Sequence, residues 1–167
     1  MALYASWSPG IAFMPAERPG DHLQNANNIA WTDIVGLRQS GGATFRGESG
    51  GDNWFHVPIA TPVIVNDVRA KLAQVFVMFL CGDPKGDVVS AGANITNIHV
   101  WDDPNRIHQF GAFKLFGEHR FRLDTDNTFK MPAPLRDIVF GIEIAVRVTF
   151  TVDQSVTFAS AGADFIV

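Results

Sequence analysis

Histidine and tryptophan side chains are the groups in this sequence that could bind a metal or stack on a ligand. The five histidines are His22, His56, His99, His108 and His119. No two of them show the H-x-H or the i, i+4 spacing that is typical of zinc motifs. The single cysteine, Cys81, also excludes an internal disulfide and a cysteine-based zinc cage. We therefore predict neither a metal site nor a cofactor.

One predicted hairpin gathers two of these histidines beside a tryptophan. The segment DPNR at 103–106 has proline in the second position of a turn, which favours a chain reversal there. The predicted cross-strand pairs are Asp102 with Ile107, Trp101 with His108, and His99 with Phe110. Strand parity then predicts one shared face with Asp103 at its rim, made of His99, Trp101, His108 and Phe110.

This face has two interpretations. The two imidazoles could coordinate a metal while Trp101 stacks on a sugar ring, or the histidines are simply hydrogen-bonded on a half-exposed aromatic surface. We favour the second, because two histidines without a clear carboxylate partner make a weak metal site. The segment NWFHVPIA at 53–60 adds Trp54 and His56 on one strand face. The candidate ligand-binding residues are Trp54, His56, His99, Trp101, Asp103 and His108.

Two short motifs suggest chemistry that their context does not support. The segment GESGG at 47–51 matches the pattern around a hydrolase nucleophile, but a strand-like segment follows where such an enzyme has a helix. We predict that Ser49 is not a nucleophile, and we assign no catalytic residue. Asp124 and Asp126 lack the spacing of a calcium loop and its distal Glu, so we interpret them as turn residues.

The segment 138–152, IVFGIEIAVRVTFTV, predicts the strand around which these residues are organised. Its even positions are apolar and most odd positions are small or polar, the pattern of a strand with one buried face. Such a strand needs a second apolar layer. We predict an all-β chain, with residues 1–167 forming a single-domain antiparallel β-sandwich of jelly-roll-like or Greek-key type. The segment 62–71 is the one place where a short helix is an alternative to strand structure.

A second strand, LAQVFVMFL at 72–80, is apolar on both faces. If its even positions face the core, the apolar side chains at the odd positions point away from the core. Another surface must then shield them from water. Large apolar patches are rare on soluble monomers, so we predict a homo-oligomer. The candidate interface residues are Val75, Val77 and Phe79.

Composition excludes several partners. The net charge of −4 argues against nucleic acid, because phosphate binding needs a basic face. No apolar run approaches the length of a membrane span, and the N-terminal residues MALYASWSPG lack the regions of a signal peptide. A cytoplasmic location is therefore the default expectation.

Three segments resemble a family of small bacterial proteins that is known only as a domain of unknown function. They are NWFHVPIATPVI at 53–64, AGADF at 161–165 and the turn DPNRI at 103–107. The resemblance implies a single β-rich domain and no activity or functional residue. We predict a non-enzymatic protein that self-associates through apolar sheet surface, with a carbohydrate- or small-ligand-binding module as the alternative.

Overall fold

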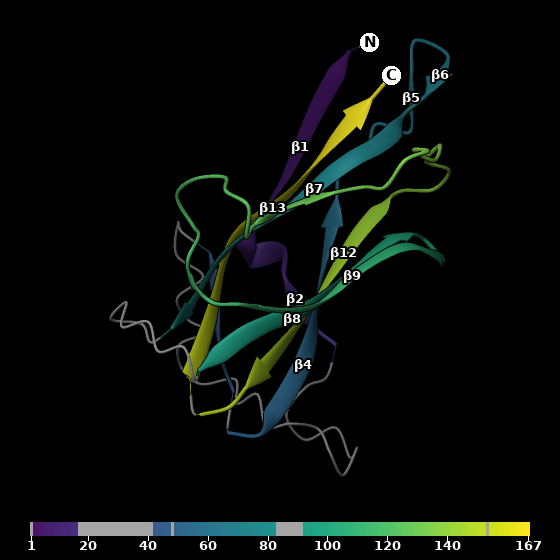
Figure 1. Cartoon of the computed structure of the whole chain (residues 1–167). Helices are drawn as coiled ribbons and strands as arrows, with labels where there is room; N and C mark the ends of the chain where they lie inside the picture. The colour runs from purple at the N-terminus through teal and green to yellow at the C-terminus, as the bar shows by residue number, and fades with distance from the viewer. Residues whose placement is uncertain (1, 17–41, 48, 83–91, 153) are drawn as a thin grey trace.

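The computed structural model describes residues 2–16, 42–47, 49–82, 92–152 and 154–167. In these ranges the chain forms an antiparallel β-sandwich, as predicted, with two twisted sheets packed face to face (Figure 1). His22 lies outside the described residues. The N- and C-terminal strands run side by side, and Ala2 and Val167 exchange two backbone hydrogen bonds.

The first layer, here called the β7 sheet, has the order β1-β13-β7, with β10 and β11 both on the outer edge of β7. Strand β3 shares with β1 the other edge of β13. Its strands are β1 (Leu3–Pro9), β3 (Ala43–Gly47), β7 (Lys71–Gly82), β10 (Gly117–Glu118), β11 (Thr128–Lys130) and β13 (Gln154–Ile166). The segment between β10 and β11 therefore lies along the edge of β7.

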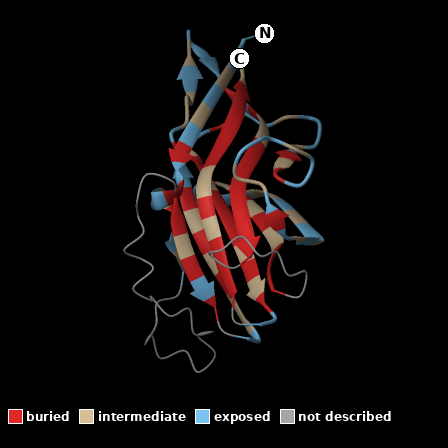
Figure 2. Cartoon of the chain, turned by 90° about the vertical axis from the view of Figure 1, so that its left-hand side faces the viewer, coloured by how far each residue is buried: buried red, intermediate tan, exposed pale blue. Residues whose placement is uncertain are grey.

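The second layer, here called the β12 sheet, has the order β2-β4-β12-β8-β9. Its strands are β2 (Met14–Pro15), β4 (Gly51–Ile59), β8 (Ala93–Asp102), β9 (Asn105–Leu115) and β12 (Ile142–Phe150). Aromatic side chains join the two layers, because Phe55 of β4 packs on Phe45 of β3 and Phe158 of β13. The buried residues run as a continuous layer through the centre of the strands (Figure 2).

The predicted central strand is confirmed over most of its length. Ile142, Ile144, Val146 and Val148 are buried in the core between the sheets. The strand begins after Gly141, and Val139 and Phe140 are exposed, so the predicted alternation stops there. A buried carboxylate holds this end of the strand: Asp102 accepts hydrogen bonds from the backbone N–H groups of residues 139, 140 and 141 at 2.7–2.9 Å.

The predicted interface on β7 is wrong. Val75, Val77 and Phe79 are fully buried and point into the core, the opposite parity to the one expected. An irregularity at Ala73 shifts the register between β7 and β13, which lets Leu72 face the core as well. Self-association through these side chains loses its basis, and the oligomeric state stays a prediction.

The other face of β7 is covered by the chain itself. Trp7 of β1 stacks on Phe76, with ring centroids 5.3 Å apart and an angle of 11° between the ring planes. The buried Asn127 contacts Met78, with 3.6 Å between Nδ2 and Sδ. The chain itself thus covers both apolar faces of β7.

The predicted helix at 62–71 is also absent, and a small hairpin of β5 (Ile64–Val65) and β6 (Val68–Arg69) stands there. Asn66 and Asp67 have φ of 49° and 64°, the two positive values of a tight hairpin turn. Within the described ranges the helical element is the single 3₁₀ turn η1 (Gly10–Ala12). No helix in the described part of the chain is long and apolar enough to cross a membrane.

Candidate functional site

The outer face of the β12 sheet carries an aromatic depression of about 310 Å³. Its floor is Ala145, which pairs with His56 of β4 on one side and with His99 of β8 on the other. One step along the strands, the neighbouring rows place Trp54 beside Arg147, and Trp101 beside Glu143. Strand pairing therefore fixes these side chains on one face. The lining residues are Ala16, Trp54, His56, His99, Trp101, Arg106 and Ala145.

The rings of the depression pack on one another. Trp54 lies against His99 with ring centroids 4.3 Å apart, and His99 meets Trp101 edge-on at 6.5 Å. The guanidinium of Arg106 lies 5.9 Å from the centroid of the Trp101 ring, within the range of a cation–π contact. These contacts restrict the indole rings, so less ordering entropy is lost when a ligand packs on them.

Polar groups border the rings on two sides. The His56 Nδ1 atom lies 2.5 Å from Glu143 Oε1 of the adjacent strand. On the other side of Trp54, Arg147 Nε donates to Asp52 Oδ2 at 2.5 Å. Three charged side chains, Asp52 of β4 and Glu143 and Arg147 of β12, are thus held in place beside the aromatic surface.

His99 is the side chain of the depression with a displaced pKa. Burial lowers its pKa below the ordinary value of 6.5, and the positive charge of Arg106 and the neighbouring His56 lower it further. The imidazole is therefore neutral at neutral pH. A neutral ring can stack on a ligand and can donate or accept a hydrogen bond.

The Trp101 indole N–H is buried and has no hydrogen-bond partner among the described residues. A buried donor without a partner costs roughly 1–3 kcal/mol. Such groups are uncommon in native proteins and are often found at functional sites. This donor belongs to the same ring that Arg106 covers.

The predicted register of the hairpin is wrong by two residues next to the turn, and by one residue from Val100 onward. Asp102 pairs with Asn105, not with Ile107, so the loop has two residues instead of four. Trp101 then pairs with Arg106, and a bulge at Ile107 places Val100 opposite His108. The two-residue shift at the turn places Arg106 opposite Trp101, and the bulge moves His108 to the other face of the sheet.

Four of the six candidate residues therefore come together, and two do not. Trp54, His56, His99 and Trp101 line the depression. His108 lines a different cavity of about 260 Å³, with Leu72 and the segment 131–136, and its ring packs edge-on against Phe110. Asp103 is exposed in the turn of the hairpin. The sequence reasoning also missed Arg106, Glu143 and the alanine floor, which depend on the pairing of β12 with its neighbours.

Two other residues that the sequence analysis considered, Cys81 and Ser49, lie outside this site. Cys81 is fully buried, and burial raises the pKa of its thiol far above the ordinary range, as expected for an inert cysteine. Ser49 is exposed, and its hydroxyl donates to the backbone carbonyl of Thr151 at 2.9 Å.

No family model and no curated protein matches the chain. A solved structure described as a xylan-binding module, CBM15, aligns over 99% of this chain and 97% of its own, with 13% identity and a TM-score of 0.43. Similarity at this level says nothing of the ligand of this chain. The resemblance of segments 53–64 and 161–165 to a bacterial family stays a prediction.

Proposed function

We propose that this protein is a non-enzymatic binding module that takes a carbohydrate on the aromatic depression of the β12 sheet. The observation that carries the proposal is the arrangement of two indoles and a neutral imidazole around Ala145. Pyranose rings have flat C–H faces that pack on aromatic planes, and hydroxyl groups at their edges. A shallow aromatic surface with a polar border complements both features.

The polar border fits hydroxyl groups better than a charged ligand. The His56–Glu143 pair and Arg106 present donors and acceptors of both signs next to the rings. A neutral sugar can satisfy such a mixed set by donating to the carboxylate and accepting from the guanidinium. A strongly anionic or cationic ligand would be repelled by one of these groups.

The same geometry favours binding over hydrolysis. A glycosidase generally places two carboxyl groups on either side of the scissile bond. Here Glu143 is hydrogen-bonded to His56, and the residues that line the depression include no carboxylate. The rings form a platform, and the charged groups at their border are paired or cover a ring.

The proposal can be tested with neutral oligosaccharides of glucose, xylose, mannose and galactose, by calorimetry and tryptophan fluorescence. We expect at least one to bind, and Trp54→Ala to weaken its binding at least tenfold, which corresponds to about 1.4 kcal/mol. Trp7→Phe is the matched control, because Trp7 lies on the other sheet and should leave binding unchanged. The proposal fails if none of these sugars binds, or if the Trp54 variant binds as tightly as the parent protein.

A further inference from the structure

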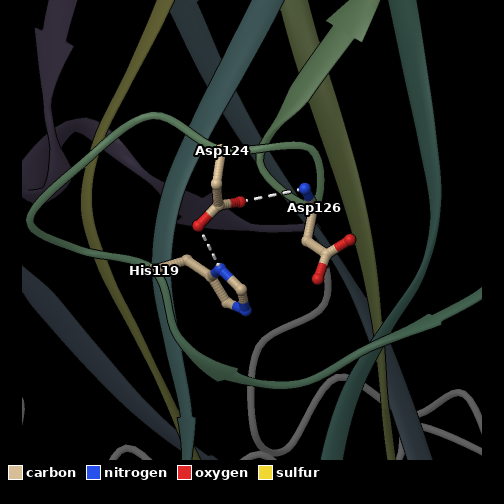
Figure 3. Close-up of side chains that lie close together, drawn as sticks. All are labelled: His119, Asp124 and Asp126. Atoms are coloured by element: carbon tan, nitrogen blue, oxygen red, sulfur yellow. Dashed lines mark hydrogen bonds and ion pairs between the residues drawn. The ribbon is translucent and has the colours of Figure 1, made fainter.

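A second cluster of side chains lies on the other sheet, in the loop at 119–127 between β10 and β11. It brings His119, Asp124 and Asp126 together, with one ligand atom from each within 4.8 Å of the others (Figure 3). The loop lies on the edge of β7, where the His119 backbone N–H donates to the carbonyl of Phe79 at 2.8 Å. This cluster is separate from the aromatic depression and has no part in the function proposed above.

The His119 ring is oriented by two oxygen atoms, one from the backbone and one from Asp124. Its Nε2 atom lies 3.0 Å from the backbone carbonyl oxygen of Phe116, which can only accept a hydrogen bond, so Nε2 carries the hydrogen. Its Nδ1 atom then lies 2.8 Å from Asp124 Oδ2. Both ring nitrogens therefore face oxygen atoms, with Nδ1 turned toward the aspartate and Nε2 toward the backbone carbonyl.

The carboxylate of Asp124 is oriented by the backbone. Its Oδ1 atom accepts hydrogen bonds from the N–H groups of Asp126 and Asn127 at 2.9 and 3.2 Å, which leaves Oδ2 toward the histidine. Burial alone would raise its pKa, but the hydrogen bonds from His119 and from these two N–H groups lower the pKa overall. The backbone thus fixes which carboxylate oxygen of Asp124 points toward the His119 ring.

The loop itself is held by one buried amide. Asn127 is fully buried, donates to the carbonyls of His119 and Arg122 at 3.2 and 2.7 Å, and accepts from the N–H of Asp124 at 2.8 Å. The His119 ring also packs on Phe79, with centroids 4.8 Å apart. Two of the three ligands are thus positioned by groups outside the cluster.

Arg120, which follows His119 in the sequence, is paired with Glu118 outside the cluster. Arg120 is bound to Glu118, with contacts of 2.8 and 3.1 Å from Nε and 2.5 Å from one terminal nitrogen. Two carboxylates therefore face one imidazole without a fixed cationic partner among the described contacts of Asp124 and Asp126.

We propose that His119, Asp124 and Asp126 bind a divalent transition-metal cation of the Zn²⁺ type. One imidazole nitrogen with two carboxylate oxygens is a donor set that such ions accept, while Ca²⁺ takes six to eight oxygen ligands. The bond from Nε2–H to the carbonyl of Phe116 is the contact that metal-binding histidines commonly make with their second nitrogen. Three protein ligands leave a coordination position open to solvent.

The test is a titration of ZnCl₂ into the full, untagged chain after treatment with a chelator, followed by calorimetry and by thermal unfolding. We expect one equivalent of Zn²⁺ to bind and to raise the melting temperature. Asp126 is exposed, so Asp126→Asn leaves the fold intact and should weaken the affinity at least tenfold. His119→Gln should abolish binding.

Matched controls are Asp67→Asn, an exposed acid in the β5–β6 turn, and His108→Gln, a histidine in another cavity. Both should bind Zn²⁺ like the parent protein. The proposal is overturned if Zn²⁺ does not saturate a single site, in which case His119 and Asp124 form a hydrogen-bonded pair only. It is overturned equally if Asp126→Asn binds Zn²⁺ as tightly as the parent chain does.

Discussion

Apolar side chains are covered on one outer face of the sandwich and partly exposed on the other. On the β7 sheet, Trp7 lies flat on Phe76, and Asn127 brings the loop at 119–127 over Met78. On the β12 sheet, Trp54 and Trp101 surround a small residue and remain partly open to solvent. An apolar run along a strand therefore does not by itself indicate a partner surface, whereas the clustered rings of the β12 sheet stay accessible to solvent, which is where we propose the binding site.

The most damaging change on the covered face should be Asn127→Ala. It removes the acceptor of the Asp124 N–H and the donors to the carbonyls of His119 and Arg122. Leaving these groups unpaired should cost about 3 kcal/mol or more of unfolding free energy, measured by urea denaturation. The exposed neighbour Thr125→Ala is the control and should change little. Equal losses in the two variants would show that the buried amide does not hold the loop.

A smaller effect is expected at Gly162, the floor beneath Trp7. A Cβ atom there would lie 2.7 Å from the indole ring and 2.9 Å from the Ser6 carbonyl oxygen. Gly162→Ala should therefore displace the ring and cost about 1–3 kcal/mol, with a change in tryptophan fluorescence.

A double-mutant cycle with Trp7→Ala can separate the two causes of this cost, the clash with the indole ring and the clash with the Ser6 carbonyl oxygen. If Trp7 is the obstacle, the alanine at position 162 should cost less once the indole is gone. The same cost in both backgrounds would point to the backbone oxygen of Ser6 instead.

The smallest expected effect is a pH dependence that comes from the open face. The folded state lowers the pKa of His99, so the unfolded chain takes up a proton first as the pH falls. This contribution to stability is complete above the unfolded pKa of about 6.5 and is lost as the pH falls toward the lower folded value.

His99→Gln should therefore lose part of the decrease in stability between pH 7.5 and 5.5, measured by thermal unfolding at a series of pH values. His108→Gln is the control for a histidine elsewhere. If His99→Gln keeps the full decrease, the neutral imidazole is not the source of the pH dependence.

Much of the fold could be predicted from local pattern. The alternation in β12 identified its buried side chains, because a strand between two layers repeats every second residue. The parity of β7 could not be read in this way, since both of its faces are apolar. What covers each face depends on Trp7 and Asn127, which lie far away in sequence and are not part of any strand-wide apolar pattern.

The candidate site shows the same limit. Trp54, His56, His99 and Trp101 were found because tryptophans and histidines are recognisable as residue types. The exchange of His108 for Arg106 depends on a two-residue loop and a bulge, which the segment DPNR does not specify by itself. The cluster of His119 with Asp124 and Asp126 was not predicted, because the two aspartates were interpreted as turn residues and the fold of the loop that brings His119 to them cannot be read from their spacing.

The carboxylate of Asp102 has a consequence for partial unfolding. The chain from 103 to 138 leaves β8 as the outer strand β9 of one sheet, then crosses to supply β10 and β11 at the edge of the other. Asp102 binds the backbone at 139–141, so the entry and exit of this excursion are fastened at one residue. Without that fastening the excursion could open as a unit and leave β7 and β8 as unprotected edges, the kind that pair with other chains and aggregate.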